Sequence, residues 1–383
     1  MKVLNGTIQE DLEPSIFQTI TGVEDEQEDG NEFITDPFDP TQIRVTTRNP
    51  QIGALLNRIK ENELDMAPDF QRQAGIWSDK TQSKLIESIL IRIPLPAFYM
   101  DALDDDRWLV VDGLQRLTAI DRFAQTKNLT LEGLEFLKQL EGKKFDELPR
   151  IYQRRILETE VIVYLIDRGT PPEVKFTIFK RINTGGLPLS LQEIRHALNK
   201  QQSREFLREL ANLPSFKKAT TGSISSQRMT DRECVLRFMA FVLTSYSEYA
   251  SRDLDTFLNS AMAQLDKMSP SELKNLQAQF ERAMRIAHVL FEQYAFRKRE
   301  SLEKNRKLPI NKALFEAWSV NLSKLTELQV DELYDRQDEL IKKSIELIND
   351  RAFDKSISLG TGSINNVRER FGRVERLIQE VLR

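Results

Sequence analysis

The stretch Arg107-Trp-Leu-Val-Val-Asp-Gly-Leu-Gln-Arg-Leu-Thr-Ala-Ile-Asp121 decides the fold of the N-terminal half of the chain. Its apolar run from Trp108 to Val111 is rich in β-branched residues and predicts one buried strand. Asp112-Gly113 ends that run. Apolar residues then recur at helical spacing, at Leu114, Leu117, Ile120 and Phe123. The stretch therefore predicts a strand, a tight turn and a helix.

The start of this helix is a candidate anion site, because a helix N-terminus presents unpaired N–H groups and a partial positive charge. Arg116, in the first turn with Gln115, has the planar guanidinium that suits a phosphate. Asp112 is a candidate metal ligand or water-orienting group. A structural interpretation stays open, because Asp112 and Gln115 have capping-box spacing and Gly113 suits a turn. An ionised Asp112 would also repel a phosphate unless a cation lies between them.

Composition limits the class of protein. The chain has 383 residues, enough for two domains, and is 40% hydrophobic. No run is long enough to predict a membrane span, and no export signal is expected. The single cysteine, Cys234, suits a reducing cytoplasm and excludes an internal disulfide framework. With only two histidines, a structural zinc site and a His-Asn-His nuclease centre are not expected.

Charge is unevenly distributed along the chain. Residues 1–40 hold eleven acidic residues and one lysine, a net charge of −10, so the remainder carries +6 of the total of −4. Repulsion and prolines predict a mobile acidic tail over residues 1–40. A mildly basic body is compatible with nucleic-acid binding and also with proteins that bind none.

The first half of the chain alternates strands and helices. Alternation or apolar runs predict strands at 43–47, 64–66 and 159–166, and a hairpin across 97–111. Helical spacing predicts helices over 52–59 and after Ser78, a plausible N-cap. Between them, Arg72 lies between Phe70 and Trp77, which suits either an anion-binding or stacking role or a surface arginine beside a core tryptophan.

A helix opened by Pro171-Pro172 leads into a second glycine-containing turn. Gly185 and Gly186 would let backbone N–H groups approach a ligand closely. Asn183 and Gly185 also fit a left-handed helix stop, so both interpretations stay open. Ser190 and Glu193 form a capping box for the next helix.

From residue 201 onward the pattern is helical, with helices expected near 253–264, 270–299, 309–325, 330–349 and 363–382. Two basic sets lie in this half. The first is residues 297–307; the second is Arg368, Arg370, Arg373 and Arg376. They suit either a nucleic-acid backbone or a solvated face.

Asp112-Gly-Leu-Gln-Arg-Leu-Thr118 resembles the DGQQRLT signature of the domain-of-unknown-function-262 family. That family supplies the N-terminal part of GmrSD-type restriction enzymes and belongs to the ParB/sulfiredoxin-like superfamily. Gln71-Arg72 with Trp77 and residues 179–195 resemble further family elements, as do residues 228–238 and 361–371. The sequence departs from the signature at Leu114, where the family usually has Gln.

The resemblance implies an α+β fold. A small mixed-sheet ParB-like domain is expected over 41–200 and an all-helical domain over 201–383. It also implies a nucleoside triphosphate, Mg²⁺ and anti-phage restriction directed at DNA, such as phage or modified DNA. Asp112 and Arg116 are the expected catalytic residues, with Asp112 on the metal. The expected nucleotide-site residues are Gln71, Arg72, Gly113, Gln115, Arg116, Asn183, Gly185, Gly186 and Arg195.

Two-part members of the family carry a His-Asn-His nuclease domain, and this chain shows none. The expected function is therefore a cytoplasmic sensor or regulator that binds a nucleoside triphosphate and works with a separate nuclease. Hydrolysis and homo-oligomer formation stay open, and no membrane partner is expected. Two alternatives remain: a self-sufficient, metal-dependent ParB-like DNA nuclease, and a non-catalytic DNA-binding or adaptor protein, which the Leu114 departure fits.

Overall fold

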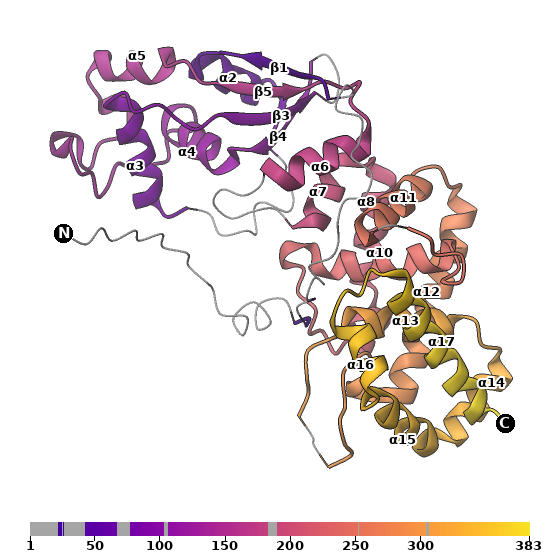
Figure 1. Ribbon diagram of the computed structural model, residues 1–383. Coiled ribbons are helices and arrows are strands. Elements are labelled where there is room, and N and C mark those ends of the chain that lie inside the picture. The colour runs from indigo at the N-terminus through magenta and orange to yellow at the C-terminus, as the bar shows by residue number, and fades with distance from the viewer. Residues whose placement is uncertain are drawn as a thin grey trace, which may run out of the picture. The chain divides into compact units, whose positions relative to one another are not determined.

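The computed structural model describes residues 22–24, 26, 43–66, 77–102, 106–182, 190–251, 253–303 and 306–383. These residues form two compact units (Figure 1). Each unit has its own hydrophobic core. The mixed unit consists of the described residues in 43–198. The helical unit consists of those in 199–383, joined by residues 22–24 and 26. Within the described chain, no helix combines the length and apolarity that crossing a membrane requires.

The mixed unit is built on a five-stranded sheet in the order β1-β5-β3-β4-β2. β5 and β3 pair in parallel, as do β4 and β2, while β1–β5 and β3–β4 are antiparallel. The strands are β1 (Val45–Arg48), β2 (Leu64–Asp65), β3 (Phe98–Ala102), β4 (Trp108–Asp112) and β5 (Val163–Ile166). The sheet is therefore mixed, as expected, and the hairpin prediction is confirmed. The strand predicted over 159–166 is shorter, beginning at Val163.

Side chains alternate across this sheet, and both faces are covered. Phe98, Met100 and Val110 face a core shared with helices α2 to α5. Val111 and Ile166 face the opposite side, where Phe176, Phe179 and Ile194 of α6 and α7 pack. The helices are α2 (Ile52–Lys60), α3 (Asp79–Leu90), α4 (Leu114–Ala124), α5 (Arg150–Glu158), α6 (Pro172–Ile182) and α7 (Leu191–Leu198), with 3₁₀ turns at Lys138–Leu140 and Phe145–Glu147.

Helix starts in the mixed unit test the capping predictions. Ser78 accepts from the Thr81 amide at 3.2 Å, and Ser190 and Glu193 bond reciprocally, so both of these caps are confirmed. The capping box expected from Asp112 is wrong. Gly113 is the N-cap of α4, and it offers no side-chain hydrogen bond.

The helical unit contains α8 (Gln201–Asn212), α9 (Pro214–Ala219), α10 (Thr230–Leu243), α11 (Leu254–Leu265), α12 (Pro270–Phe291), α13 (Lys312–Ser323), α14 (Glu327–Asp335), α15 (Gln337–Ile348), α16 (Arg351–Ser358) and α17 (Ile364–Val381), with 3₁₀ turns at Gln227–Met229 and Glu292–Tyr294. Aromatic rings fill its core, as in the edge-to-face pair of Phe238 and Phe280, whose centroids are 5.1 Å apart. The α+β fold with an all-helical second half is therefore confirmed.

Two long predicted helices are broken. The helix expected over 270–299 ends at Phe291, because Glu292 has a φ of +49° and leaves the helical conformation. The helix expected over 330–349 is two helices, α14 and α15, that meet at Arg336.

Two arginines of the basic sets are structural. Arg297 is 4% exposed and donates to the Thr220 carbonyl at 3.1 Å and to Ser223 Oγ at 2.6 Å. Arg370 is fully buried and pairs with Glu316 at 2.5 Å. The interpretation of these two residues as backbone contacts for nucleic acid is wrong, because buried, bonded guanidinium groups cannot reach a duplex.

Part of the predicted acidic tail belongs to the helical unit. Val23 forms a parallel bridge with Ile310, and both Glu24 and Glu26 form ion pairs with residues of this unit. The charge pattern did not predict these contacts. Apart from Gly22, the other residues of 1–40 lie outside the described residues.

Candidate functional site

The candidate site begins where β4 ends. Tyr99 of β3 lies opposite Asp112, and Met100 lies opposite Val110, so Val111 is the extra residue of a β-bulge. A bulge bends its strand and redirects the side chains beside it, and bulges are common next to functional sites. The bulge lies directly before Asp112-Gly113, the turn that the sequence predicted.

Gly113 makes the turn from β4 into α4 with a φ of +97°. A Cβ at this position would lie 2.3 Å from Cδ1 of Phe98, a residue that is itself fully buried. Only glycine combines that conformation with that approach. Because Gly113 has no side chain to cap α4, the N-terminus of the helix carries no side-chain hydrogen bond.

Arg116 is a clamp inside the domain. Its guanidinium donates to Asp112 Oδ2 at 2.8 Å, to the Ala97 carbonyl at 3.2 Å and to the Pro96 carbonyl. It also lies over the Phe98 ring, 4.5 Å from the centroid. Burial lowers the pKa of Arg116, and Asp112 partly offsets this effect. The group therefore ties the start of β3 to the turn after β4.

The Asp112–Arg116 pair removes the repulsion that the sequence suggested. The guanidinium balances the charge of the carboxylate, whose side chain is 27% exposed. An anion at the start of α4 would therefore meet a neutralised pair in place of an uncompensated carboxylate.

Gln115 connects α4 to the segment that contains the first family element. Its Oε1 accepts from the backbone N–H of Trp77 at 3.2 Å, and the Trp77 carbonyl accepts from Gln82 at 2.6 Å. Trp77, which belongs to the same family element and lies five residues after Arg72, is thus fixed beside the start of α4. Gln71 and Arg72 themselves lie outside the described residues.

Helix α7 contains the last residues of the family element at 179–195, and it packs near the end of β4. Ile194 of α7 packs in one cluster with Val111, the residue before Asp112. Arg195 is 1% exposed and lies 5.3 Å from the Phe176 ring centroid. Gln192 is also 1% exposed, and its amide has no hydrogen-bond partner among the described residues. Asn183, Gly185 and Gly186 lie outside the described residues.

One buried pair was missed by the sequence interpretation. Asp101 of β3 is 1% exposed, and its Oδ1 lies 2.6 Å from Nζ of Lys175 on α6. Burial raises the pKa of Asp101 to about 6, although Lys175 acts to lower it. Two features of the sequence could have indicated this pair. Asp101 lies two residues after Tyr99 and so on the same face of the strand, and Lys175 lies four residues before the buried Phe179 and so on the same face of the helix.

The residues present fit a magnesium ion only in combination with a ligand. Asp112 Oδ2 is bonded to Arg116, which leaves Oδ1 as a metal donor. Mg²⁺ commonly takes one or two protein carboxylates and completes its shell with water and phosphate oxygens. Across the described residues, no three His, Cys, Asp or Glu side chains gather into a possible metal site.

These observations define the class: an α+β domain with helices over both faces of a mixed sheet and an uncapped helix start after a bulged strand. The particular family follows from comparison with known families. Residues 52–200 match the family model described as GmrSD restriction endonuclease, N-terminal domain, so this part of the chain is similar to that family, as its motifs predicted. Searches of curated proteins and of solved structures found no match. The family match indicates a restriction-system protein.

Proposed function

We propose that the mixed unit binds a nucleoside triphosphate and acts as the sensor or regulator of a restriction system directed at DNA, working with a separate nuclease. The main support is the start of α4, where Gly113 leaves the helix uncapped and Arg116 neutralises Asp112. Unpaired N–H groups at a helix start favour phosphate. The family match supports the restriction role.

In this proposal the first-turn N–H groups of α4 receive the phosphates, and Asp112 Oδ1 serves a Mg²⁺ ion bound with them. The ion would supply charge neutralisation of the triphosphate. Arg116 acts as a positioning residue through Asp112, because its donors are already committed to Asp112 and two carbonyls. The remaining predicted ligand contacts are Gln71, Arg72, Asn183, Gly185, Gly186 and Arg195.

Leu114 suits a site that binds a nucleotide better than a site that hydrolyses one. Its side chain packs against the core of the mixed unit, where the family signature has a polar Gln. An apolar, partly buried side chain cannot orient a water for attack on phosphate. We therefore place nucleotide binding ahead of rapid hydrolysis.

A thermal-shift panel tests nucleotide binding. Each of the four ribonucleoside triphosphates with Mg²⁺ is added to the full chain, to Asp112→Asn and to Asp146→Asn, a control whose carboxylate is 64% exposed. A ligand at a hundred times its Kd stabilises by about 2.7 kcal/mol. We expect one nucleotide to stabilise the wild type and the control, and Asp112→Asn to lose the magnesium-dependent part. No shift with any nucleotide would favour the adaptor alternative.

DNA cleavage is tested separately. Purified full chain is incubated with supercoiled plasmid, Mg²⁺ and the stabilising nucleotide, with and without any nuclease that a neighbouring gene encodes. We expect cleavage only in the presence of the nuclease. Nicking by the chain alone that Asp112→Asn abolishes would establish the self-sufficient nuclease in place of the regulator.

A further inference from the structure

The N-terminal strap, residues 22–24 and 26, belongs to the helical unit and pairs with it through an isolated parallel bridge between Val23 and Ile310. The Glu24 amide donates to the Ile310 carbonyl at 2.8 Å, and the Ile310 amide donates to the Gly22 carbonyl at 3.1 Å. Val23, between them, is 4% exposed and belongs to the helical core. Backbone pairing and a buried side chain are the contacts of an extended peptide in a groove.

Gly22 makes the closest approach of the strap. Its φ is +73°, and a Cβ there would lie 1.7 Å from the Ser223 carbonyl oxygen. The same loop is fixed from the other side, because Arg297 donates to Ser223 Oγ at 2.6 Å. Only glycine therefore fits at this point of the strap.

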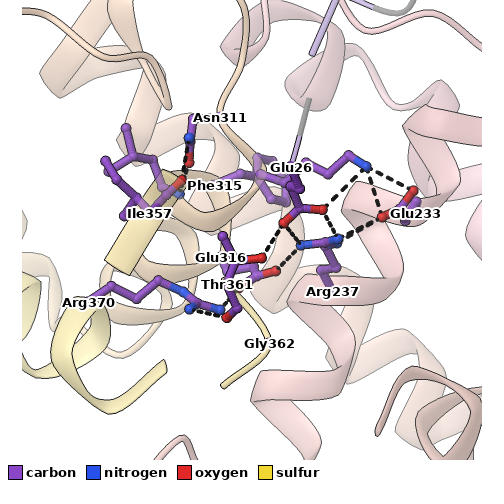
Figure 2. A network of polar contacts seen from close by, with 12 residues as sticks. Glu26, Glu233, Arg237, Asn311, Phe315, Glu316, Ile357, Thr361, Gly362 and Arg370 are labelled. Atoms are coloured by element: carbon purple, nitrogen blue, oxygen red, sulfur yellow. Dashed lines mark hydrogen bonds and ion pairs between the residues drawn. The ribbon is translucent and has the colours of Figure 1, made fainter. Parts of the chain in front are cut away.

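The two acidic side chains of the strap bind separate polar groups. Glu24 pairs with Lys298 at 2.9 Å and accepts from Asn311 Nδ2 at 3.0 Å. Glu26 accepts from Thr361 Oγ1 at 2.7 Å and from Arg237 Nη1 at 2.9 Å. Figure 2 shows the Glu26 carboxylate between Thr361 and the guanidinium of Arg237.

The groups that bind Glu26 are held by a wider buried network. Arg237 also bonds Glu233 at 3.0 Å and Glu316 at 2.7 Å. Glu316 in turn pairs with Arg370 at 2.5 Å, and Arg370 donates to the Thr361 carbonyl at 2.6 Å (Figure 2). Residues 228–238 and 361–371, two motifs that the proposed function does not use, thus meet here. Arg237 and Thr361 therefore have partners other than Glu26 that hold them in place.

We propose that the helical unit contains a binding groove for an extended acidic peptide, and that the chain's own strap fills this groove as a detachable ligand. A peptide is favoured over nucleic acid because the Ile310 pairing requires a polypeptide backbone and the burial of Val23 requires an apolar side chain. This inference is independent of the nucleotide proposal.

The strap also changes how the chain connects its units. The described chain runs from the helical unit at residue 26 to the mixed unit at residue 43, and returns near residue 199. Docking of the strap therefore adds a second link between the units. Its release would leave only the link near residue 199.

A cut-and-retain experiment on the full chain tests the proposal. A specific protease site is inserted between Glu32 and Phe33, the protein is cleaved, and the N-terminal fragment is followed by size exclusion at low salt. We expect the fragment to stay with the body of the protein. Gly22→Ala and Glu26→Gln should each release it at least about tenfold faster. Gly142→Ala, with a similar φ of +75° and nothing within 4 Å of an added Cβ, is the matched control.

A second measurement covers the case in which a variant does not fold. Cleaved wild-type protein is mixed with a labelled synthetic peptide of residues 16–30, which should exchange into the groove, while a peptide with Gln at positions 24 and 26 should not. Immediate loss of the fragment after cleavage, or equal retention in all variants, would overturn the proposal. Displacement by duplex DNA and not by the peptide would show a nucleic-acid site instead.

Discussion

At the scale of single residues, Gly113 controls the turn on which the candidate site depends. Gly113→Ala places a Cβ 2.3 Å from Phe98 at a φ of +97°. We expect it to lower the free energy of unfolding of the mixed unit by about 3 kcal/mol, because both the conformation and the overlap are unfavourable. Urea denaturation measures this change.

Gly142→Ala separates the two causes of that loss. Its backbone is similar, but an added Cβ meets nothing within 4 Å. It should therefore lose only about 1 kcal/mol. Equal losses in the two variants would show that the contact with Phe98 is unimportant.

Glu26 gives the helical unit an acid-sensitive contact. Burial alone would raise the pKa of Glu26, but Arg237 and Lys312, with hydrogen bonds from Arg237 and Thr361, outweigh it and hold the pKa well below 4.5. A carboxyl with a depressed pKa stabilises the folded state above its unfolded value, and that contribution is lost as pH falls through the folded value.

We therefore expect Glu26→Gln to destabilise the helical unit by about 2–3 kcal/mol at pH 7, and the difference from wild type to shrink below about pH 4.5. Chemical denaturation across pH 3–7 measures both effects. Glu327→Gln, whose carboxylate is 83% exposed, should change stability by less than about 0.5 kcal/mol. A difference that stays constant with pH would contradict the assigned ionisation.

Single residues also show what the sequence could not predict. Gly113 was expected from the turn signal, because its neighbours in the chain determine that conformation. The orientation of the Arg116 side chain was not expected. Two of its acceptors are the main-chain carbonyls of Pro96 and Ala97, and main-chain groups carry no signal in the sequence. The Asp101–Lys175 pair was missed for a similar reason: the two residues meet only after β3 and α6 have packed.

At the scale of elements, α4 holds the start of α3 through one side chain. Gln115→Leu removes the acceptor of the Trp77 amide, a hydrogen bond worth about 1 kcal/mol. Amide exchange in peptides that contain Trp77 should become about fivefold faster, as measured by mass spectrometry. Gln125→Leu, at the other end of α4, where the amide bonds Asp121, should leave that exchange unchanged. Equal acceleration in both variants would mean that α4 as a whole has loosened.

Elements with strong local signals were predicted well. The hairpin of β3 and β4 follows from two apolar runs around an acidic turn, and Ser78 follows from its capping position. Helix ends were predicted poorly where the stop has no glycine or proline, as at Glu292 and Arg336. The strap was missed because the acidic residues around Val23 favour a solvated tail, and only its distant partners in the helical unit reverse that preference.

At the scale of the whole molecule, the two units should unfold separately, because each has its own core. Calorimetry should show two transitions. Gly113→Ala should lower one of them and Glu26→Gln the other, and a bound nucleotide should raise only the transition that Gly113→Ala lowers. One transition that moves with every variant would show that the units unfold together.

The chain's one thiol lies in the helical unit. Cys234 is fully buried in α10, and burial raises the pKa of its thiol above the usual range. Such a sulfur is inert while its surroundings stay closed, since the thiolate is the reactive form. A slow alkylating reagent will consequently modify molecules in which the helical unit has unfolded. It will not modify molecules in which only the mixed unit has unfolded. The alkylation rate of Cys234 therefore reports unfolding of the helical unit and not of the mixed unit.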